Sequence, residues 1–207
     1  MSGVASAQQL PRGRHRLSRA EVLESQRGRM LAAMARAVAA KGFARTVVAD
    51  VLAGAGVSRE TFYEHFRDKE DCFLAAYEAS VETLLAIMTE ATAGAEDADP
   101  IQRFDRATAA YLELMARDDA LARVFLIDVY AAGAPALERR LDVFERFVDM
   151  VAEIFGARTQ PERLRAEALV GALSSMVTMR VAAKKTAELP MLREPVLALA
   201  RSLWAEA

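Results

Sequence analysis

Hydrophobic residues recur along most of this chain at intervals of three and four positions, the spacing that places side chains on one face of an α-helix. The stretch 69–92 shows this most clearly, with Phe73, Tyr77, Leu84 and Met88 on a single face. No stretch shows the strict alternation that is typical of a half-buried strand. The pattern therefore predicts an all-α fold of about nine helices. The expected ranges of the first eight are 18–41, 46–55, 58–66, 69–92, 100–117, 119–131, 135–155 and 159–185. The last helix is expected to start at either 190 or 195 and to end at 205.

Capping residues mark where several of these helices begin. Ser18 followed by Glu21 forms a capping box, and Asp68 is placed to cap the longest helix. Gly28 interrupts the first helix, and a glycine in a helix interior costs about 1 kcal/mol relative to alanine. The sequence therefore leaves open a separate, weaker turn of helix over residues 18–26.

Two short helices joined by a glycine turn lie between Gly42 and Phe73. Thr46 can cap the first through its hydroxyl and Ser58 can cap the second, while Gly54 and Gly56 supply the backbone freedom of the turn. The second helix would bury its phenylalanines and carry polar side chains outward, where they can reach phosphates and base edges. This arrangement predicts a helix-turn-helix. The alternative is a plain helical hairpin that binds nothing.

The order of residues in this stretch resembles the DNA-binding signature of the TetR (tetracycline-repressor) family of bacterial transcription regulators. Gly-Val-Ser ends at Ser58, Thr-Phe-Tyr spans 61–63, Phe66 follows, and Lys-Glu begins at Lys69. With the preceding helix, the resemblance covers roughly residues 25–80. Val47 departs from the pattern, because the family often carries a hydroxyl there. The residues that the resemblance places against double-stranded DNA are Thr46, Ser58, Arg59, Thr61, Tyr63, His65 and Lys69.

Charge is divided unevenly along the chain. Residues 1–70 hold 12 Lys and Arg against 7 Asp and Glu, a net charge of +5, whereas residues 71–207 hold 15 against 22, a net charge of −7. This division favours a DNA-binding part joined to a part that stays off DNA, with ordinary charge scatter as the alternative.

The chain is accordingly divided into three segments. Residues 1–17 contain Arg12, Arg14 and Arg16 but no acidic residue, so they are expected to form a flexible basic arm that either adds phosphate contacts or does nothing. The other two segments are a helix-turn-helix DNA-binding domain over 18–68 and a helical ligand-binding and dimerisation domain over 69–207.

Small residues are interspersed with large apolar ones over 159–205. Small side chains let helices approach closely, so the last two helices are expected to form a four-helix bundle with those of a second copy. The TetR resemblance implies the same homodimer. The alternative is that these helices only close the core of the monomer. The residues expected at the interface are Leu169, Leu173, Val177, Leu197, Leu203 and Trp204.

Methionine and aromatic residues are frequent in the second part of the chain, and methionine adapts to irregular cavities. They are candidates for an apolar ligand pocket, which the resemblance also implies, although they could form only core. Asp128 and Arg180 are charges within apolar runs that could orient a ligand, face solvent or form an ion pair. The candidate pocket residues are Met88, Phe104, Tyr111, Met115, Phe125, Asp128, Phe147, Met176 and Arg180.

The sequence gives little support for catalysis. Its two histidines are His15 in the arm and His65 in the second short helix, so no Ser-His-Asp or Cys-His set is available in the body. The only cysteine, Cys72, excludes an internal disulfide and a cysteine-based metal cluster, and is better explained as a buried structural thiol than as a redox sensor. We expect no cofactor and no metal. Without an uninterrupted apolar run of 18 residues or a signal peptide, the chain is expected in the cytoplasm.

Together with the resemblance, these features predict a TetR-like transcriptional regulator, most simply a repressor that binds a palindromic operator as a homodimer. A small, largely apolar ligand would release it from DNA by favouring another arrangement of its two DNA-binding domains. The alternative is a helical protein-interaction module whose DNA-binding domain is vestigial.

Overall fold

The computed structural model describes residues 18–95 and 97–205, so the proposed basic arm lies outside the described residues. Every regular element within the described residues is an α-helix or a short 3-10 helix, which confirms the all-α prediction. In chain order the elements are α1 (Arg19–Lys41), η1 (Phe43–Arg45), α2 (Val48–Ala55), α3 (Arg59–His65), α4 (Lys69–Thr92), α5 (Pro100–Arg117), α6 (Asp119–Leu126), η2 (Asp128–Ala132), α7 (Ala134–Phe155), α8 (Gln160–Ala182), η3 (Thr186–Leu192) and α9 (Arg193–Trp204).

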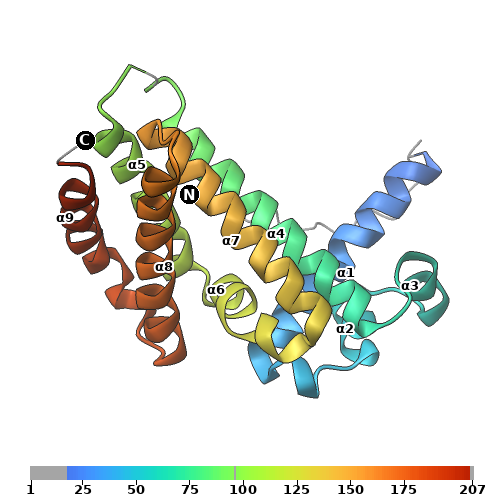
Figure 1. Cartoon of the computed structure of the whole chain (residues 1–207). Helices are drawn as coiled ribbons and strands as arrows, with labels where there is room; N and C mark the ends of the chain where they lie inside the picture. The colour runs from blue at the N-terminus through green and yellow to red at the C-terminus, as the bar shows by residue number, and fades with distance from the viewer. Residues whose placement is uncertain (1–17, 96, 206–207) are drawn as a thin grey trace.

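The helices form two groups that α4 connects. We call α1, η1, α2 and α3 the head, and α4 to α9 the body. The head lies at one end of the molecule and α5, α8 and α9 lie at the other, while α4 runs between them with α7 alongside (Figure 1). Helix α6 also packs against α1. Movements in the body can therefore reach the head through α4, through α6 and through the η2 segment that follows α6.

The predicted caps are present. Ser18 Oγ accepts the backbone N–H of Glu21 at 3.2 Å, and the Glu21 carboxylate accepts the backbone N–H of Ser18 at 2.7 Å. The backbone N–H and the hydroxyl of Ser18 both donate to this carboxylate and lower the pKa of Glu21. Asp68 Oδ1 accepts the backbone N–H of Asp71 at 2.7 Å at the start of α4. Helix α1 runs without a break through Gly28, so the separate turn over 18–26 does not form.

The region between α6 and α7 differs from the prediction. The helix expected over 119–131 ends at Leu126, and the chain continues as the 3-10 helix η2 up to Gly133. Gly133 has a φ of 90°, a conformation that side chains other than glycine rarely adopt, so it ends the element. This early end of α6 turns the η2 segment toward η1, with which it is in contact.

Helix α4 buries one face along most of its length. Cys72, Phe73, Tyr77 and Val81 are all fully buried, and burial raises the pKa of the Cys72 thiol to about 12. Among the described residues, α4 is the one helix long and apolar enough to cross a membrane by length and composition alone, although 39% of its most apolar window is buried. Core helices of soluble proteins pass the same test, and α4 packs against α1, α5 and α6.

Candidate DNA-binding surface and ligand cavity

The second helix of the helix-turn-helix, α3, has one buried face and one exposed face. Phe62 and Phe66, four positions apart, are 0% and 4% exposed, and their ring centroids lie 5.5 Å apart. Arg59 and Tyr63 lie on the other face, and Tyr63 is 50% exposed. The phenylalanines therefore hold α3 to the head and leave its polar face free to enter a major groove.

The two glycines near the turn before α3 have different roles. Gly56 has a φ of 64° and ends α2 in the left-handed conformation, as expected for a sharp turn. Gly54 lies inside α2, where an added Cβ would come within 3.0 Å of Ala33 Cβ. The expectation that Gly54 bends the turn is therefore wrong, and its role is to let α2 approach α1 closely. Arg29 of α1 reinforces this contact by donating a hydrogen bond to the carbonyl oxygen of Ala55.

Thr46 does not have its expected role. Its hydroxyl donates a hydrogen bond to the carbonyl oxygen of Gly42 at 2.9 Å, and the residue is 1% exposed. Helix α2 begins after Val47, whose backbone N–H donates to Asp50 Oδ2 at 2.8 Å. Thr46 thus neither caps α2 nor presents its hydroxyl to solvent, and we remove it from the candidate DNA contacts.

Lys69, the first residue of α4, contacts η1. Its Nζ lies 4.1 Å from the centroid of the Phe43 ring and donates to the Phe43 carbonyl oxygen at 3.3 Å. The Phe43 ring also packs against Phe73 of α4, with centroids 4.8 Å apart. Glu70 Oε1 lies 3.8 Å from the same Nζ. These contacts hold η1 against the start of α4.

A carboxylate from the body reaches the same segment. Asp128, the first residue of η2, accepts the backbone N–H of Phe43 through Oδ1 at 3.4 Å and is 6% exposed. Its Oδ2 has no hydrogen-bond partner among the described residues, and Arg123 Nη2 lies 3.8 Å from it. Burial raises the pKa of Asp128, while Arg123 and the Phe43 N–H oppose this effect. Phe43 is therefore held by Lys69 of α4 and by Asp128 of η2.

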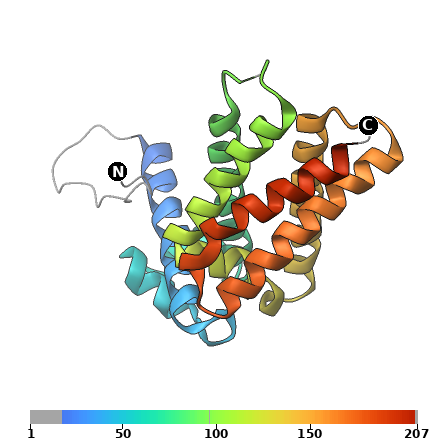
Figure 2. The ribbon, with the colours of Figure 1, turned by 90° about the vertical axis from the view of Figure 1, so that its left-hand side faces the viewer.

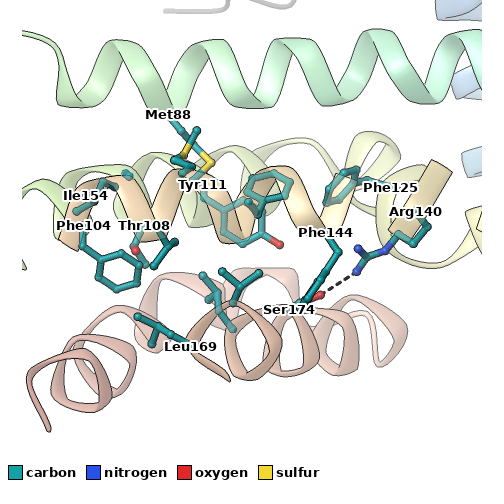
Figure 3. A pocket seen from close by; sticks show the side chains of 16 residues that line it. Met88, Phe104, Thr108, Tyr111, Phe125, Arg140, Phe144, Ile154, Leu169 and Ser174 are labelled. Carbon is teal, nitrogen blue, oxygen red and sulfur yellow. Dashed lines mark hydrogen bonds between the residues drawn. The ribbon is translucent and has the colours of Figure 1, made fainter. Parts of the chain in front are cut away.

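An apolar cavity lies inside the body, lined by residues from α4 to α8 (Figure 3). Its volume of about 40 Å³ gives room for roughly two or three water molecules. Because the surrounding interior is closely packed, a larger molecule enters only if side chains or helices move apart. The lining residues are Met88, Phe104, Ala107, Thr108, Tyr111, Phe125, Arg140, Phe144, Phe147, Met150, Val151, Ile154, Leu169, Val170, Leu173 and Ser174.

One charged side chain lines this cavity. Arg140 of α7 is 8% exposed, and its Nη2 donates to Ser174 Oγ of α8 at 2.9 Å (Figure 3). Its guanidinium carbon lies 5.8 Å from the centroid of the Phe125 ring. Within the part of the chain that the structure describes, Arg140 Nε has no hydrogen-bond partner and the guanidinium forms no ion pair.

Phe125 connects the cavity to η2. Its ring stacks on Tyr77 at a centroid distance of 5.8 Å and meets the edge of Phe147 at 6.1 Å. It also precedes Asp128 by three residues, at the point where α6 gives way to η2. A displacement of Phe125 can therefore reach the contact between Asp128 and Phe43 through a very short stretch of chain.

Residues 30–76 match the profile of the bacterial regulatory proteins of the tetR family. The match begins inside α1, includes η1, α2 and α3, and ends inside α4. This chain is a TetR-family transcription regulator. It carries the family's DNA-binding domain in its head.

Solved structures of TetR-like regulators share the fold of most of the chain, in both head and body. The regulator FadR from Bacillus subtilis, solved in complex with stearoyl-CoA, is 19% identical with a TM-score of 0.74, over 83% of this chain and 96% of that one. The fatty acid degradation regulator FadR from Bacillus halodurans is 21% identical with a TM-score of 0.71, over 84% and 93%. A TetR-like regulator from Rhodococcus sp. RHA1 is 24% identical with a TM-score of 0.67, over 91% and 98%. A comparison with curated proteins finds no match.

Five of the predicted DNA contacts of this TetR-family protein lie together around α3. Arg59 and Tyr63 are exposed, Thr61 is half-buried, and Ser58 is exposed while its Oγ accepts the Thr61 backbone N–H at 3.0 Å. His65 is half-buried, and its Nε2 is buried without a hydrogen-bond partner among the described residues. Contact of any of these side chains with DNA stays a prediction.

Five of the nine residues predicted for a ligand pocket lie at this cavity, and binding of a ligand there stays a prediction. Met88, Phe104, Tyr111, Phe125 and Phe147 do line the cavity. Four others do not: Met115 is fully buried elsewhere in the core, Asp128 faces η1, Met176 is half-buried, and Arg180 donates to the Met176 carbonyl oxygen of its own helix at 3.1 Å.

Arg140 was not among the predicted pocket residues, although its position in the sequence carried a signal. Arg140 falls on the apolar stripe of α7, four positions after Ala136 and before Phe144. A charge on the inner stripe of an amphipathic helix is expected to be buried. Asp128 and Arg180 were predicted as pocket residues because their neighbours along the chain are apolar. Apolar neighbours in the sequence do not identify the helix face on which a side chain lies.

Three of the residues predicted at the dimer interface are buried within the monomer. Leu169 and Val177 are 0% exposed and Leu197 is 2% exposed, so their side chains are unavailable to a second copy. Leu173 lines the cavity. Leu203 and Trp204 are half-buried, and Trp204 stacks on Phe155 with centroids 4.0 Å apart.

Another face of α8 carries exposed apolar and small side chains. Leu164 and Met179 are 55% and 68% exposed, and the exposed residues Ala168 and Ser175 lie between them at helical spacing. Helices α8 and α9 lie together on the same side of the body (Figure 2). We call the residues Leu164, Ala168, Ser175 and Met179 the α8 stripe.

Replacing Asp128 tests its bond to η1. Asp128→Ala is expected to lower the free energy of unfolding by about 1–3 kcal/mol, because the buried Phe43 N–H loses its acceptor. Asp128→Asn keeps an acceptor oxygen and removes the charge. Since the pKa of Asp128 is raised, the folded protein binds this proton more readily than the unfolded chain. The wild-type protein should therefore gain stability relative to Asp128→Asn as the pH falls through the folded pKa.

Urea unfolding of the three proteins across the acidic to neutral range measures these effects. Other titrating groups are shared, so they cancel in the difference between the wild-type protein and Asp128→Asn. An unchanged difference at every pH would show that Asp128 is not a desolvated carboxylate.

Proposed function

We propose that this TetR-family regulator represses transcription by binding a palindromic operator as a homodimer, and that a small, largely apolar molecule in the cavity releases it. The observation that carries the proposal is the division of α3. Phe62 and Phe66 are buried, which leaves Arg59 and Tyr63 on an exposed face that suits a major groove. The protein would act in the cytoplasm.

The proposed domains follow the same division. Residues 18–68 would bind DNA, residues 69–207 would bind the ligand and the second copy, and residues 1–17 would add phosphate contacts. The α8 stripe supports dimerisation, because its exposed apolar and small side chains suit a helix packed across a two-fold axis. Two heads about 34–36 Å apart would then read both halves of a palindrome.

Release from DNA would depend on the cavity and α4. Met88 of α4 lines the cavity, and Lys69 at the start of the same helix holds η1. These residues are separated by 19 positions, or about 28 Å of helix. A ligand that widens the cavity would displace α4 or Phe125 and thereby the contacts of Phe43. It shifts the balance only by its different affinity for the two arrangements.

The FadR structure from Bacillus subtilis was solved with stearoyl-CoA. That ligand belongs to that protein, but its long apolar chain supports the proposal of a largely apolar effector here. The cavity of about 40 Å³ would have to expand greatly to hold such a molecule.

Selection of bound sequences from a random DNA pool tests the proposal, and two substitutions sharpen it. Arg59→Ala should reduce discrimination between the selected operator and random DNA by about 1–3 kcal/mol, as expected if Arg59 reads a base. Lys69→Ala should weaken binding to all sequences alike, because its ammonium holds η1, which positions the head as a whole. Titration of labelled DNA measures both affinities.

Arg139→Ala in α7 is the control, since it removes one exposed positive charge from the body and none from α3. It should leave both affinities unchanged. If Arg59→Ala lowers the affinities for operator and random DNA equally, Arg59 does not read a base. If selection yields no preferred palindrome, the proposed function is wrong.

A further inference from the structure

The cavity has one polar end. Arg140 and Ser174 lie at one end of the view in Figure 3, whereas Phe104, Ile154 and Leu169 lie toward the other. The lining contributed by α7 runs from Arg140 to Ile154, which corresponds to about 21 Å of helix. The site is therefore elongated, with a cationic group at one end and apolar side chains along its length.

The Arg140 guanidinium is poorly compensated. It is 8% exposed, Nη2 donates to the neutral Ser174 hydroxyl at 2.9 Å, and Nε has no hydrogen-bond partner among the described residues. Elsewhere in the body, Arg146 and Arg163 each pair with two carboxylates on the surface. Burying a charge without a counter-ion is costly, and a bound group of opposite charge would offset that cost.

From this geometry we infer that the cavity binds an organic monocarboxylate with an elongated apolar tail, and that Arg140 pairs with its carboxylate. The inference rests on the proposed function and specifies the ligand class. A guanidinium offers parallel N–H donors that match a planar carboxylate. Ser174 Oγ accepts from Arg140, so its own proton is still available to a carboxylate oxygen.

The charge balance of the cavity disfavours a phosphate. One guanidinium and one hydroxyl balance a single negative charge, whereas a phosphate would bring about two charges and three acceptor oxygens. A neutral alcohol or ester of the same tail would occupy the apolar part but leave Arg140 unpaired. The carboxylate group, more than the tail, should therefore determine the affinity.

Matched pairs of ligands test this assignment. Decanoate and decan-1-ol share a tail, and calorimetric titration of the full chain gives a dissociation constant for each. The wild-type protein should bind decanoate roughly 10- to 100-fold more tightly, which corresponds to about 1.4–2.7 kcal/mol. Arg140→Gln should reduce this preference to within about threefold, with affinity for decan-1-ol retained. Arg139→Gln, the neighbouring exposed arginine, should keep the full preference.

Folding of the variants is checked by thermal unfolding. Arg140→Gln removes a buried unpaired charge and should melt at the wild-type temperature or above. Ser174→Ala is a second, milder variant, expected to weaken decanoate binding by roughly 3- to 10-fold. Equal affinities for acid and alcohol in the wild-type protein, tested from octanoate to hexadecanoate, would overturn the assignment. The assignment would also be overturned if stearoyl-CoA bound more tightly than octadecanoate and Arg140→Gln changed neither affinity.

The two proposals fail independently. If DNA selection yields a palindrome but acids bind no better than alcohols, the carboxylate site is wrong and the proposed function stands. If acids bind with the expected dependence on Arg140 but no DNA sequence is preferred, the site stands and the proposed function is wrong. Release of the selected operator by decanoate from the wild-type protein, but not from Arg140→Gln, would support both.

Discussion

Phe62→Ala is expected to lower the free energy of unfolding by about 3–5 kcal/mol and to abolish DNA binding. Phe62 is fully buried in the head. The centroid of its ring lies 5.5 Å from that of Phe66 and 5.3 Å from that of Tyr63. Truncation would leave a cavity beneath α3, a helix of only seven residues that depends on this packing for its position. Urea unfolding and DNA titration measure the two effects.

Tyr63→Ala is the matched control, because Tyr63 is the next residue of α3 but is 50% exposed. It should change the free energy of unfolding by less than about 1 kcal/mol while still weakening DNA binding. The pair thus separates the residue that positions α3 from the residue proposed to touch DNA. Normal operator binding by Phe62→Ala would show that the head does not depend on this phenylalanine.

The helices of this protein were predictable because their signals are local. The bonds from Ser18 to Glu21 and from Asp68 to Asp71 span only three residues, so sequence spacing alone indicates them. The faces of α3 were predictable for the same reason, since Phe62 and Phe66 are one helical turn apart. The end of α6 was not, because η2 is held in place by a contact between Asp128 and Phe43, which are 85 residues apart.

Site residues were harder to predict than helices. Periodicity identifies the buried face of α8, and Leu169 and Val177 do lie on it, but it does not say whether the same chain or a second copy covers that face. Thr46 has the side chain of a capping residue, yet its hydroxyl bonds backward to Gly42. Arg140 is informative only because the packing of α7 against α8 leaves its charge without an ion-pair partner among the described residues.

The α8 stripe leads to the second large effect. Met179→Glu should convert the proposed dimer into a monomer and weaken operator binding by roughly 10²- to 10⁴-fold, the advantage that linking two heads provides. In a two-fold interface the substitution introduces two equivalent carboxylates into a face formed by apolar and small side chains. Because Met179 is 68% exposed in the monomer, the fold itself should be unaffected. Analytical ultracentrifugation and titration of the selected operator measure the two outcomes.

Leu141→Glu on α7 is the control for the same change of charge, since Leu141 is 59% exposed but lies outside the α8 stripe. This variant should remain a dimer and keep its affinity for the operator. Binding of random DNA by Met179→Glu should fall much less than binding of the palindrome, because each head still contacts phosphates on its own. A dimer that survives Met179→Glu but dissociates in Leu141→Glu would place the interface on α7, and the α8 stripe would then be an ordinary exposed surface.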